Sequence, residues 1–136
     1  MSTHLKDKLE KIEQVLTKLI EESAKGNPIV VEGKKDVKAL QELGVNGAIL
    51  TVKTGGKSFL EASQEIEGLG AEEVILLLDF DRRGKEGIQR LQQDLERAKI
   101  KSNLNFWREL RGLIGREISC IESLPSYLVT IREKAA

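Results

Sequence analysis

The stretch that most constrains the fold is an apolar run, Val74–Leu78, that leads directly into two aspartates, Asp79 and Asp81. A short, uninterrupted apolar run bounded by polar residues is typical of a strand buried on both faces, as in parallel sheets covered by helices. A turn needs one acidic residue at most. Two carboxylates one residue apart therefore suggest a metal ion, and the arginines that follow, Arg82 and Arg83, suggest an anion beside it.

Other short apolar runs alternate with amphipathic helical patterns along the chain, and this alternation is the signature of βαβ units and a parallel sheet. We expect strands at 28–33, 47–52, 72–80 and, at an edge, 100–107. We expect helices at 4–24, 34–44, 58–68, 85–99, 108–115 and 122–134. The predicted fold class is thus α/β and Rossmann-like. It has roughly four parallel strands flanked by helices, and an amphipathic helix at the N-terminus.

The length of the chain, 136 residues, favours a single domain with one core. Within residues 1–136 we distinguish an N-terminal helix (1–26), an α/β core (27–100) and a C-terminal strand and helix extension (101–136).

The composition excludes several classes of function. Lys plus Arg equal Asp plus Glu at 22 each, so attraction to nucleic acid must come from a local patch of charge. The one histidine, His4, lies near the chain start, and the one cysteine, Cys120, permits no internal disulfide and no cysteine-based zinc site. With no signal peptide and no membrane-length apolar run, these features lead us to expect a cytoplasmic protein.

Carboxylates follow two of the expected strands. Glu32 ends the first strand and Asp79 and Asp81 end the third, and ligands of open parallel sheets bind beyond these strand ends. Converging carboxylates repel one another, and a hard divalent cation such as Mg²⁺, with Mn²⁺ as an alternative, relieves the repulsion. Simpler explanations exist: Asp81 alone could cap the next helix, and Glu32 with Gly33 alone could form a turn.

Cations and glycines gather at the same strand ends. We expect them to bind phosphate or nucleic acid, because lysine and arginine contacts to phosphate supply most sequence-independent affinity. The candidates are Lys34, Gly55, Gly56, Lys57, Arg82 and Arg83.

The stretch 105–117, "NFWRELRGLIGRE", is a second candidate surface. It combines Arg108, Arg111 and Arg116 with Trp107, and aromatic and arginine side chains stack on bases and bind phosphates. The alternative is that Trp107 anchors the last helix to the core. Glu122 either adds a further carboxylate to the site or is an exposed residue at a helix start.

Three motifs, "IVVEGKKDVKAL", "ILTVKTGG" and "VILLLDFDRRGKEGIQRL", resemble the Toprim domain over roughly residues 27–100. This domain is shared by primases, type IA and type II topoisomerases, OLD-family nucleases and a bacterial ribosomal-RNA maturation nuclease. The whole chain is similar to small stand-alone Toprim proteins of archaeal type. The resemblance implies that Glu32 is a general acid/base and that Asp79 and Asp81 coordinate Mg²⁺. The "DRRG" sequence is closer to primase and maturase versions than to topoisomerases.

These features lead to two hypotheses. The first is Mg²⁺-dependent phosphoryl transfer on RNA or DNA, either phosphodiester cleavage by a nuclease or primase-like nucleotidyl transfer. The second is a non-catalytic metal- and phosphate-binding module that works with a protein partner in a processing complex. Topoisomerase activity is disfavoured, because the only tyrosine, Tyr127, lies outside any nucleophile-bearing domain. A phosphatase of the haloacid-dehalogenase type gives Glu32 no role.

Overall fold

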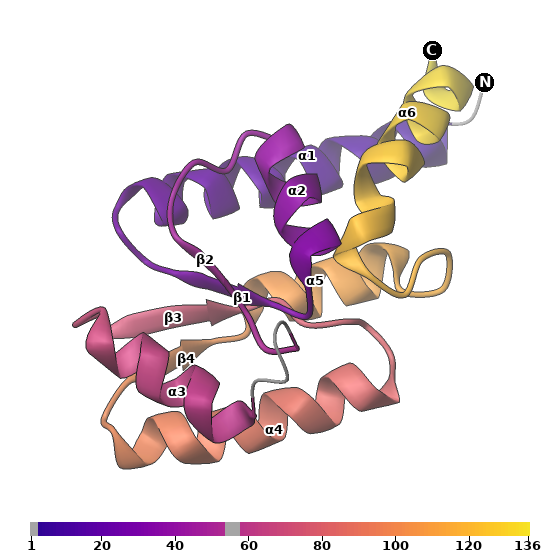
Figure 1. The fold of residues 1–136 in the computed structure, drawn as a ribbon. Coiled ribbons are helices and arrows are strands. Elements are labelled where there is room, and N and C mark those ends of the chain that lie inside the picture. Colours follow the sequence, from indigo (N-terminus) through magenta and orange to yellow (C-terminus); the bar gives the residue numbers. More distant parts are fainter. Residues whose placement is uncertain (1–2, 54–57) are drawn as a thin grey trace.

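The computed structural model describes residues 3–53 and 58–136, and it confirms the predicted parallel sheet. The four strands are ordered β2-β1-β3-β4 and every neighbouring pair is parallel (Figure 1). Their bounds are β1 (Ile29–Val31), β2 (Ile49–Thr51), β3 (Glu73–Leu76) and β4 (Lys101–Asn103). Because β1 and β3 are the two central strands, the segments that follow them leave the same edge of the sheet side by side.

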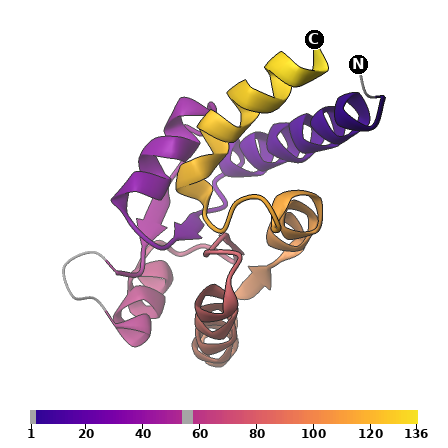
Figure 2. The same cartoon turned by 90° about the vertical axis from the view of Figure 1, so that its right-hand side faces the viewer.

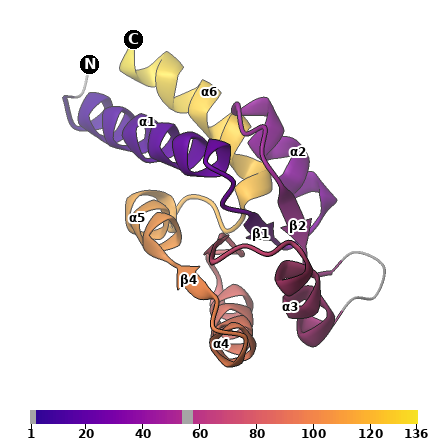
Figure 3. The same ribbon diagram turned by 90° about the vertical axis from the view of Figure 1, so that its left-hand side faces the viewer.

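Helices cover both faces of this sheet. They are α1 (Thr3–Ala24), α2 (Lys34–Glu42), α3 (Phe59–Gly68), α4 (Arg82–Arg97), α5 (Asn105–Ile114), α6 (Leu124–Ala135) and a short 3-10 helix, η2 (Ile121–Ser123). Figures 2 and 3 show α3 and α4 together on one face, and α1, α2 and α5 on the other. The last helix, α6, packs against α1 and α2, so both ends of the chain lie on the same side. None of the helices in these described ranges is long and apolar enough to cross a membrane.

The core forms where the sequence patterns place it. All three residues of β1 and all five residues of Val74–Leu78 are fully buried, as expected for central strands covered on both faces. The apolar stripe of α1 is buried through Ile12, Val15 and Leu19. Burial of this stripe explains why a long, highly charged helix remains packed on the domain.

Two elements differ from their expected bounds. The edge strand ends at Asn103, whose side-chain oxygen accepts a hydrogen bond from the backbone of Asn105 at 3.0 Å, and this local turn starts α5. Trp107 therefore lies on a helix and not on a strand. The second difference is α4, which begins at Arg82 and not near Lys85, because the side chain of Asp81 caps it.

The first turn of α4 lies directly on the backbone of Asp79. A Cβ atom placed on Gly84 would lie 1.9 Å from the Asp79 carbonyl oxygen. A glycine is thus required at this position for steric reasons, because only a residue without a side chain allows so close an approach. The position and angle of α4, and with them those of Asp81, depend on this contact.

Replacing Gly84 with alanine should therefore shift α4 away from Asp79 and destabilise the fold by about 1–3 kcal/mol, the usual range for overpacking. Gly68→Ala is the matched control, because a Cβ there meets nothing within 4 Å in the last turn of α3. Alanine should be neutral or slightly stabilising at that position. Urea denaturation of both variants measures the difference, and equal stabilities would contradict the close packing of α4 on Asp79.

Candidate metal and nucleic-acid site

A pocket of about 470 Å³ opens at the carboxyl ends of β1 and β3, and we call it the acidic pocket. It is lined by Glu32, Gly33, Lys34, Lys35, Asp36, Lys53, Asp79, Cys120 and Glu122. The first carboxylate follows β1 directly, and Asp79 follows the buried segment that extends β3. Residues that are 47 positions apart in the sequence, Glu32 and Asp79, thus share one pocket because their strands are neighbours in the sheet.

Glu32 is almost fully buried, with 7% of its surface exposed. Its Oε2 atom lies 3.1 Å from the Nζ atom of Lys53, which follows β2. The backbone also joins these residues, because the amide of Lys53 donates to the Glu32 carbonyl at 3.1 Å. The strand order β2-β1-β3 therefore places a lysine on one side of Glu32 and Asp79 on the other.

The fold disfavours the charged form of the Asp79 carboxyl, first through burial and then through neighbouring carboxylates. Burial raises its pKa from 3.8 to about 7, with further increases from the charges of Glu32, Asp36 and Asp81, and Lys53 opposes them. A carboxylic acid with this pKa is only partly ionised near neutral pH. Glu32, Asp36 and Asp81 therefore all lie close enough to Asp79 to raise the pKa of its carboxyl group.

Asp81 caps α4. Its Oδ1 atom accepts a hydrogen bond from the backbone of Gly84 at 2.8 Å, so the simpler explanation considered for Asp81 is realised in the fold. Capping does not exclude metal binding, because the Oδ2 atom of this exposed residue keeps its lone pairs. Asp81 thus differs from Asp79 in being exposed, and it supplies charge at the rim of the site.

Sequence reasoning missed Asp36. This residue is 5% exposed and lies in the first turn of α2, where its two oxygens accept hydrogen bonds from the backbone of Gly33 at 3.1 Å and of Glu122 at 2.8 Å. The available signal was its position, one helical turn after Glu32 and three residues after the residue that caps α2. Asp36 adds negative charge to the pocket and also joins α2 to the C-terminal segment.

The C-terminal segment fixes the loop that carries Asp79. The indole N–H of Trp107 lies 3.0 Å from the Leu78 carbonyl and 3.2 Å from the Asp79 carbonyl. The backbone of Phe80 donates to the carbonyl of Ser119 at 2.7 Å. With 6% of its surface exposed, Trp107 anchors this loop, and the alternative that it stacks on bases is wrong.

The donor set fits a hard divalent cation. Glu32, Asp79 and Asp81 offer carboxylate oxygens, Asp36 adds negative charge, and Lys53 lowers the pKa of Asp79. An ion held by Asp79, Asp81 and Glu32 would offset this excess of negative charge, and carboxylate oxygens are the ligands that Mg²⁺ prefers.

A second acidic group borders the same pocket. Ligand atoms of Asp36, Cys120 and Glu122 lie within 4.8 Å of one another. Both oxygens of Asp36 already accept backbone hydrogen bonds, and a thiol is a poor ligand for Mg²⁺. Among the residues that the structure describes, it is nevertheless the one group of three such side chains this close together, so an ion held by Asp79, Asp81 and Glu32 would require these side chains to draw closer. The group also places Glu122 at the acidic pocket.

The cations expected to bind phosphate divide into two groups. Lys34 lines the acidic pocket, and Arg83 lines a second pocket of about 690 Å³ between α3 and α4 that also contains Glu32 and Lys53. Arg82 is instead 3.3 Å from Glu86 on its own helix and points into solvent. The predictions for Gly55, Gly56 and Lys57 lie outside the described residues.

Comparison with known proteins agrees with this arrangement. A family profile described as the Toprim domain matches residues 27–104, which contain all four strands of the sheet. This chain belongs to the Toprim domain family. The predicted Toprim fold is therefore confirmed. Toprim domains bind divalent metal ions and act in nucleic-acid metabolism, which is consistent with the acidic pocket.

Relatives extend the similarity beyond the Toprim core. A UPF0292 protein of Methanosarcina acetivorans is 37% identical over 93% of this chain and 86% of its own length. A UPF0292 protein of Methanocaldococcus jannaschii is 38% identical over 88% of this chain and 91% of its own length. The solved structure of a putative protein from Aquifex aeolicus has a TM-score of 0.68 and 28% identity, and covers 81% of this chain and 94% of its own.

The repulsion at Asp79 predicts a pH-dependent stability. Because its folded pKa is raised from 3.8 to about 7, ionisation opposes folding, and stability in chelator should fall as pH rises through this window. Asp79→Asn cannot ionise, so its melting temperature should match that of the wild type only near pH about 3, below the unfolded pKa, and exceed it by a few degrees near pH about 8.5. Thermal melts in EDTA across this range measure the effect.

Glu67→Gln, on the exposed side of α3, is the control and should reproduce the wild-type pH profile. Adding Mg²⁺ at the higher pH should raise the melting temperature of the wild type and leave that of Asp79→Asn nearly unchanged, because a ligand that binds only the folded state stabilises it. An Asp79→Asn profile parallel to the wild-type profile would show that Asp79 is not under repulsion.

Proposed function

We propose that this Toprim protein carries out metal-dependent phosphoryl transfer on nucleic acid, with Glu32 as the proton carrier. The observation that supports the proposal most is the position of Glu32. It lines both the acidic pocket, opposite Asp79, and the larger pocket between α3 and α4. A phosphodiester placed at the boundary of the two pockets would contact a metal-binding side and a cationic side at once.

The larger pocket supplies positive charge for the substrate. Its walls carry Lys53, which follows β2, and Arg83 and Arg90 of α4, together with Phe59. Lysine and arginine contacts neutralise phosphates without reading sequence, so this pocket suits the backbone of a nucleic-acid strand. Its position next to Glu32 leads us to place the scissile phosphate there.

Each residue of the site has its own role in the proposed phosphoryl transfer. Asp79 and Asp81 hold the divalent ion, which when bound polarises the phosphate and neutralises charge on its non-bridging oxygens. Glu32 accepts the proton of the attacking water or hydroxyl and returns it to the leaving oxygen. Lys53 orients the Glu32 carboxylate through the 3.1 Å contact with Oε2. In cleavage the attacking group is water, and in nucleotidyl transfer it is the 3′ hydroxyl of a strand.

The ion pair between Lys53 and Glu32 also favours a second candidate function, a binding module that holds phosphates without turnover. A carboxylate that remains paired with a lysine is a weaker base, because the positive charge lowers its affinity for a proton. In a module of this kind Lys53 would neutralise Glu32 permanently, and a protein partner would supply the catalytic groups.

The test is an incubation of the purified protein with end-labelled RNA and DNA strands, with Mg²⁺, with Mn²⁺ and with EDTA. The proposal predicts a metal-dependent product in the wild type, and its length distinguishes cleavage from extension. Glu32→Gln should keep metal-dependent binding of the strand while turnover falls by about 10²–10⁴-fold, the usual contribution of a general base. Asp79→Ala should lose both metal binding and turnover.

Lys53→Gln separates the two candidates. If Glu32 is a base, this variant should retain turnover with an altered pH optimum, whereas a binding module should show weaker strand binding and no product in any variant. Glu67→Gln again serves as the control for loss of one surface carboxylate. A Glu32→Gln variant that turns over its substrate at the wild-type rate would refute the role of Glu32.

A further inference from the structure

A third pocket, of about 740 Å³, is lined mostly by residues outside the region matched by the Toprim profile, with Phe80 as its contribution from the matched region, and we call it the α5 pocket. We propose that the α5 pocket binds the sugar-phosphate backbone of the nucleic-acid strand, next to the metal loop. The inference takes the nature of the ligand from the proposed function, and nothing in it requires catalysis. It concerns residues of the C-terminal extension that the chemistry above does not use.

The charge of the α5 pocket is strongly positive in a protein whose formal net charge is zero. Four cationic side chains line it, from Lys8, Arg108, Arg111 and Arg116, against one carboxylate, Glu117. That carboxylate is already neutralised by Lys8, whose Nζ atom lies 2.6 Å from it. The three arginines therefore represent a local excess of positive charge at this surface, which favours an anionic ligand.

The arginines are available to such a ligand. Arg108 and Arg116 are exposed and form no ion pair with any residue in 3–53 or 58–136. Arg111 lies over the Trp107 ring at 5.3 Å, a contact that orients the guanidinium but leaves its N–H groups able to donate. An arginine held in this way loses less entropy on binding a phosphate than a free one.

The shape of the pocket depends on a glycine. Arg108 and Gly112 are four residues apart on α5, so they share one face of the helix, and a Cβ at Gly112 would meet nothing within 4 Å. The missing side chain leaves open space beside the arginines. Phe80 and Trp107 contribute to the wall of this space, and their rings lie 6.3 Å apart.

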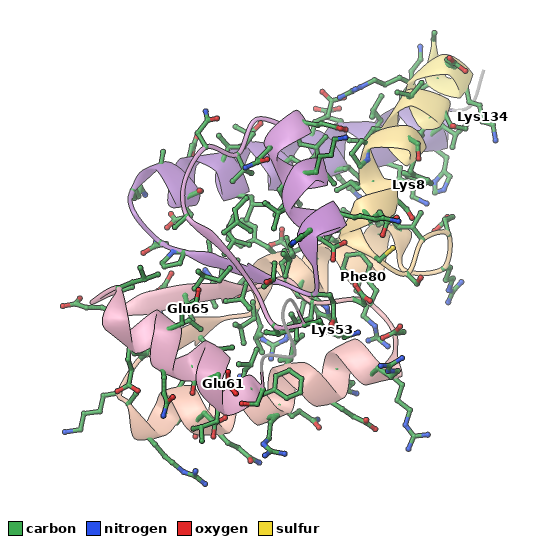
Figure 4. The ribbon with its side chains drawn as sticks, viewed as in Figure 1. Lys8, Lys53, Glu61, Glu65, Phe80 and Lys134 are labelled. Atoms are coloured by element: carbon green, nitrogen blue, oxygen red, sulfur yellow. The ribbon has the colours of Figure 1, made fainter. Side chains whose placement is uncertain are left out.

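The α5 pocket adjoins the metal loop through Phe80. This residue lies between the two aspartates in sequence, and it lines the α5 pocket while Asp79 lines the acidic pocket. Trp107, in the α5 pocket, donates to the Asp79 carbonyl at 3.2 Å. In the view of Figure 4, Phe80 lies between Lys8 and Lys53, which belong to the two different pockets. A strand that reaches the aspartates can therefore continue towards α5.

Contacts in this pocket should be to phosphate and not to bases. The Trp107 ring is buried and covered by Arg111, so no exposed aromatic face of Trp107 remains for stacking. Binding should thus be independent of sequence and should weaken steeply as the salt concentration increases. In a plot of the logarithm of the binding constant against the logarithm of the salt concentration, the slope should become shallower by about 0.7 for each phosphate contact removed from a single strand.

The experiment is fluorescence anisotropy with labelled poly(U) and poly(dT) in EDTA, so that the metal site does not contribute. Arg108→Gln/Arg116→Gln should weaken binding on the order of tenfold at moderate salt and reduce the salt slope by about 1.4. Arg97→Gln/Lys101→Gln is the control, because it removes the same charge from exposed side chains at the opposite end of the sheet. Equal losses in the two double variants, or no loss in the first, would overturn the proposal.

Gly112 offers a second test with closely matched variants. Gly112→Glu and Gly112→Gln add side chains of nearly the same size to α5, and only the first adds a negative charge to the pocket. The fluorescence of Trp107, the one tryptophan of the chain, should respond to inorganic tripolyphosphate in the wild type and in Gly112→Gln. The response should be lost in Gly112→Glu. Identical responses of the two variants would overturn the α5 pocket as an anion site.

The two proposals fail separately in these experiments. If the protein gives no metal-dependent product but binds strands in EDTA through Arg108 and Arg116, the proposed catalysis fails and the α5 pocket stands. If a product forms while the double variant binds strands like the wild type, the catalysis stands and the α5 pocket is wrong.

Discussion

The structure depends on a partly buried carboxyl group, that of Asp79, which the fold holds among other carboxylates. Pairing of β1 with β3 places Glu32 and Asp79 in one pocket, and the first turn of α2 adds Asp36. Asp81, which caps α4, adds its charge from outside the residues that line this pocket. The raised pKa of Asp79 shows that its ionised form is unfavourable in this environment. Charges that oppose one another in this way persist only where the surrounding backbone holds them, and a divalent cation converts the repulsion into attraction. The arrangement is therefore easier to explain as a metal site than as a device for stability.

The backbone that holds these charges comes from both the Toprim core and the segments around it. Gly84 allows α4 to approach the Asp79 carbonyl, and Trp107 and Ser119 fix the same loop from the C-terminal side. Asp36 joins α2 to the backbone of Glu122 in the same way. The extension that follows the family match thus has a structural role at the site. The α5 pocket gives it a binding role as well, so that metal, substrate phosphate and flanking strand would be held by adjoining parts of one surface.

The sequence predicted the fold well because its signals are local. Short apolar runs identify the central strands, and amphipathic periodicity identifies α1 and α4. It also predicted that Glu32, Asp79 and Asp81 would converge, since the carboxyl ends of parallel strands share an edge. Glu32 and Asp79 do line one pocket, whereas Asp81 caps α4 and does not line it. The sequence did not reveal the partners of these residues. The contact between Lys53 and Glu32 depends on the strand order, and that of Asp36 with the Glu122 backbone joins residues 86 positions apart. The start of α5 was missed because a side-chain contact of Asn103 sets it.

Diffraction from crystals soaked in Mn²⁺ would test the central claim most directly, because the anomalous signal locates the ion without reference to activity. We expect a peak in contact with carboxylate oxygens of Asp79 and Asp81, on the side that faces Glu32, and no peak at this position in crystals of Asp79→Asn. A peak between Asp36, Cys120 and Glu122 with none at Asp79, or no bound manganese at this edge of the sheet, would contradict the claim.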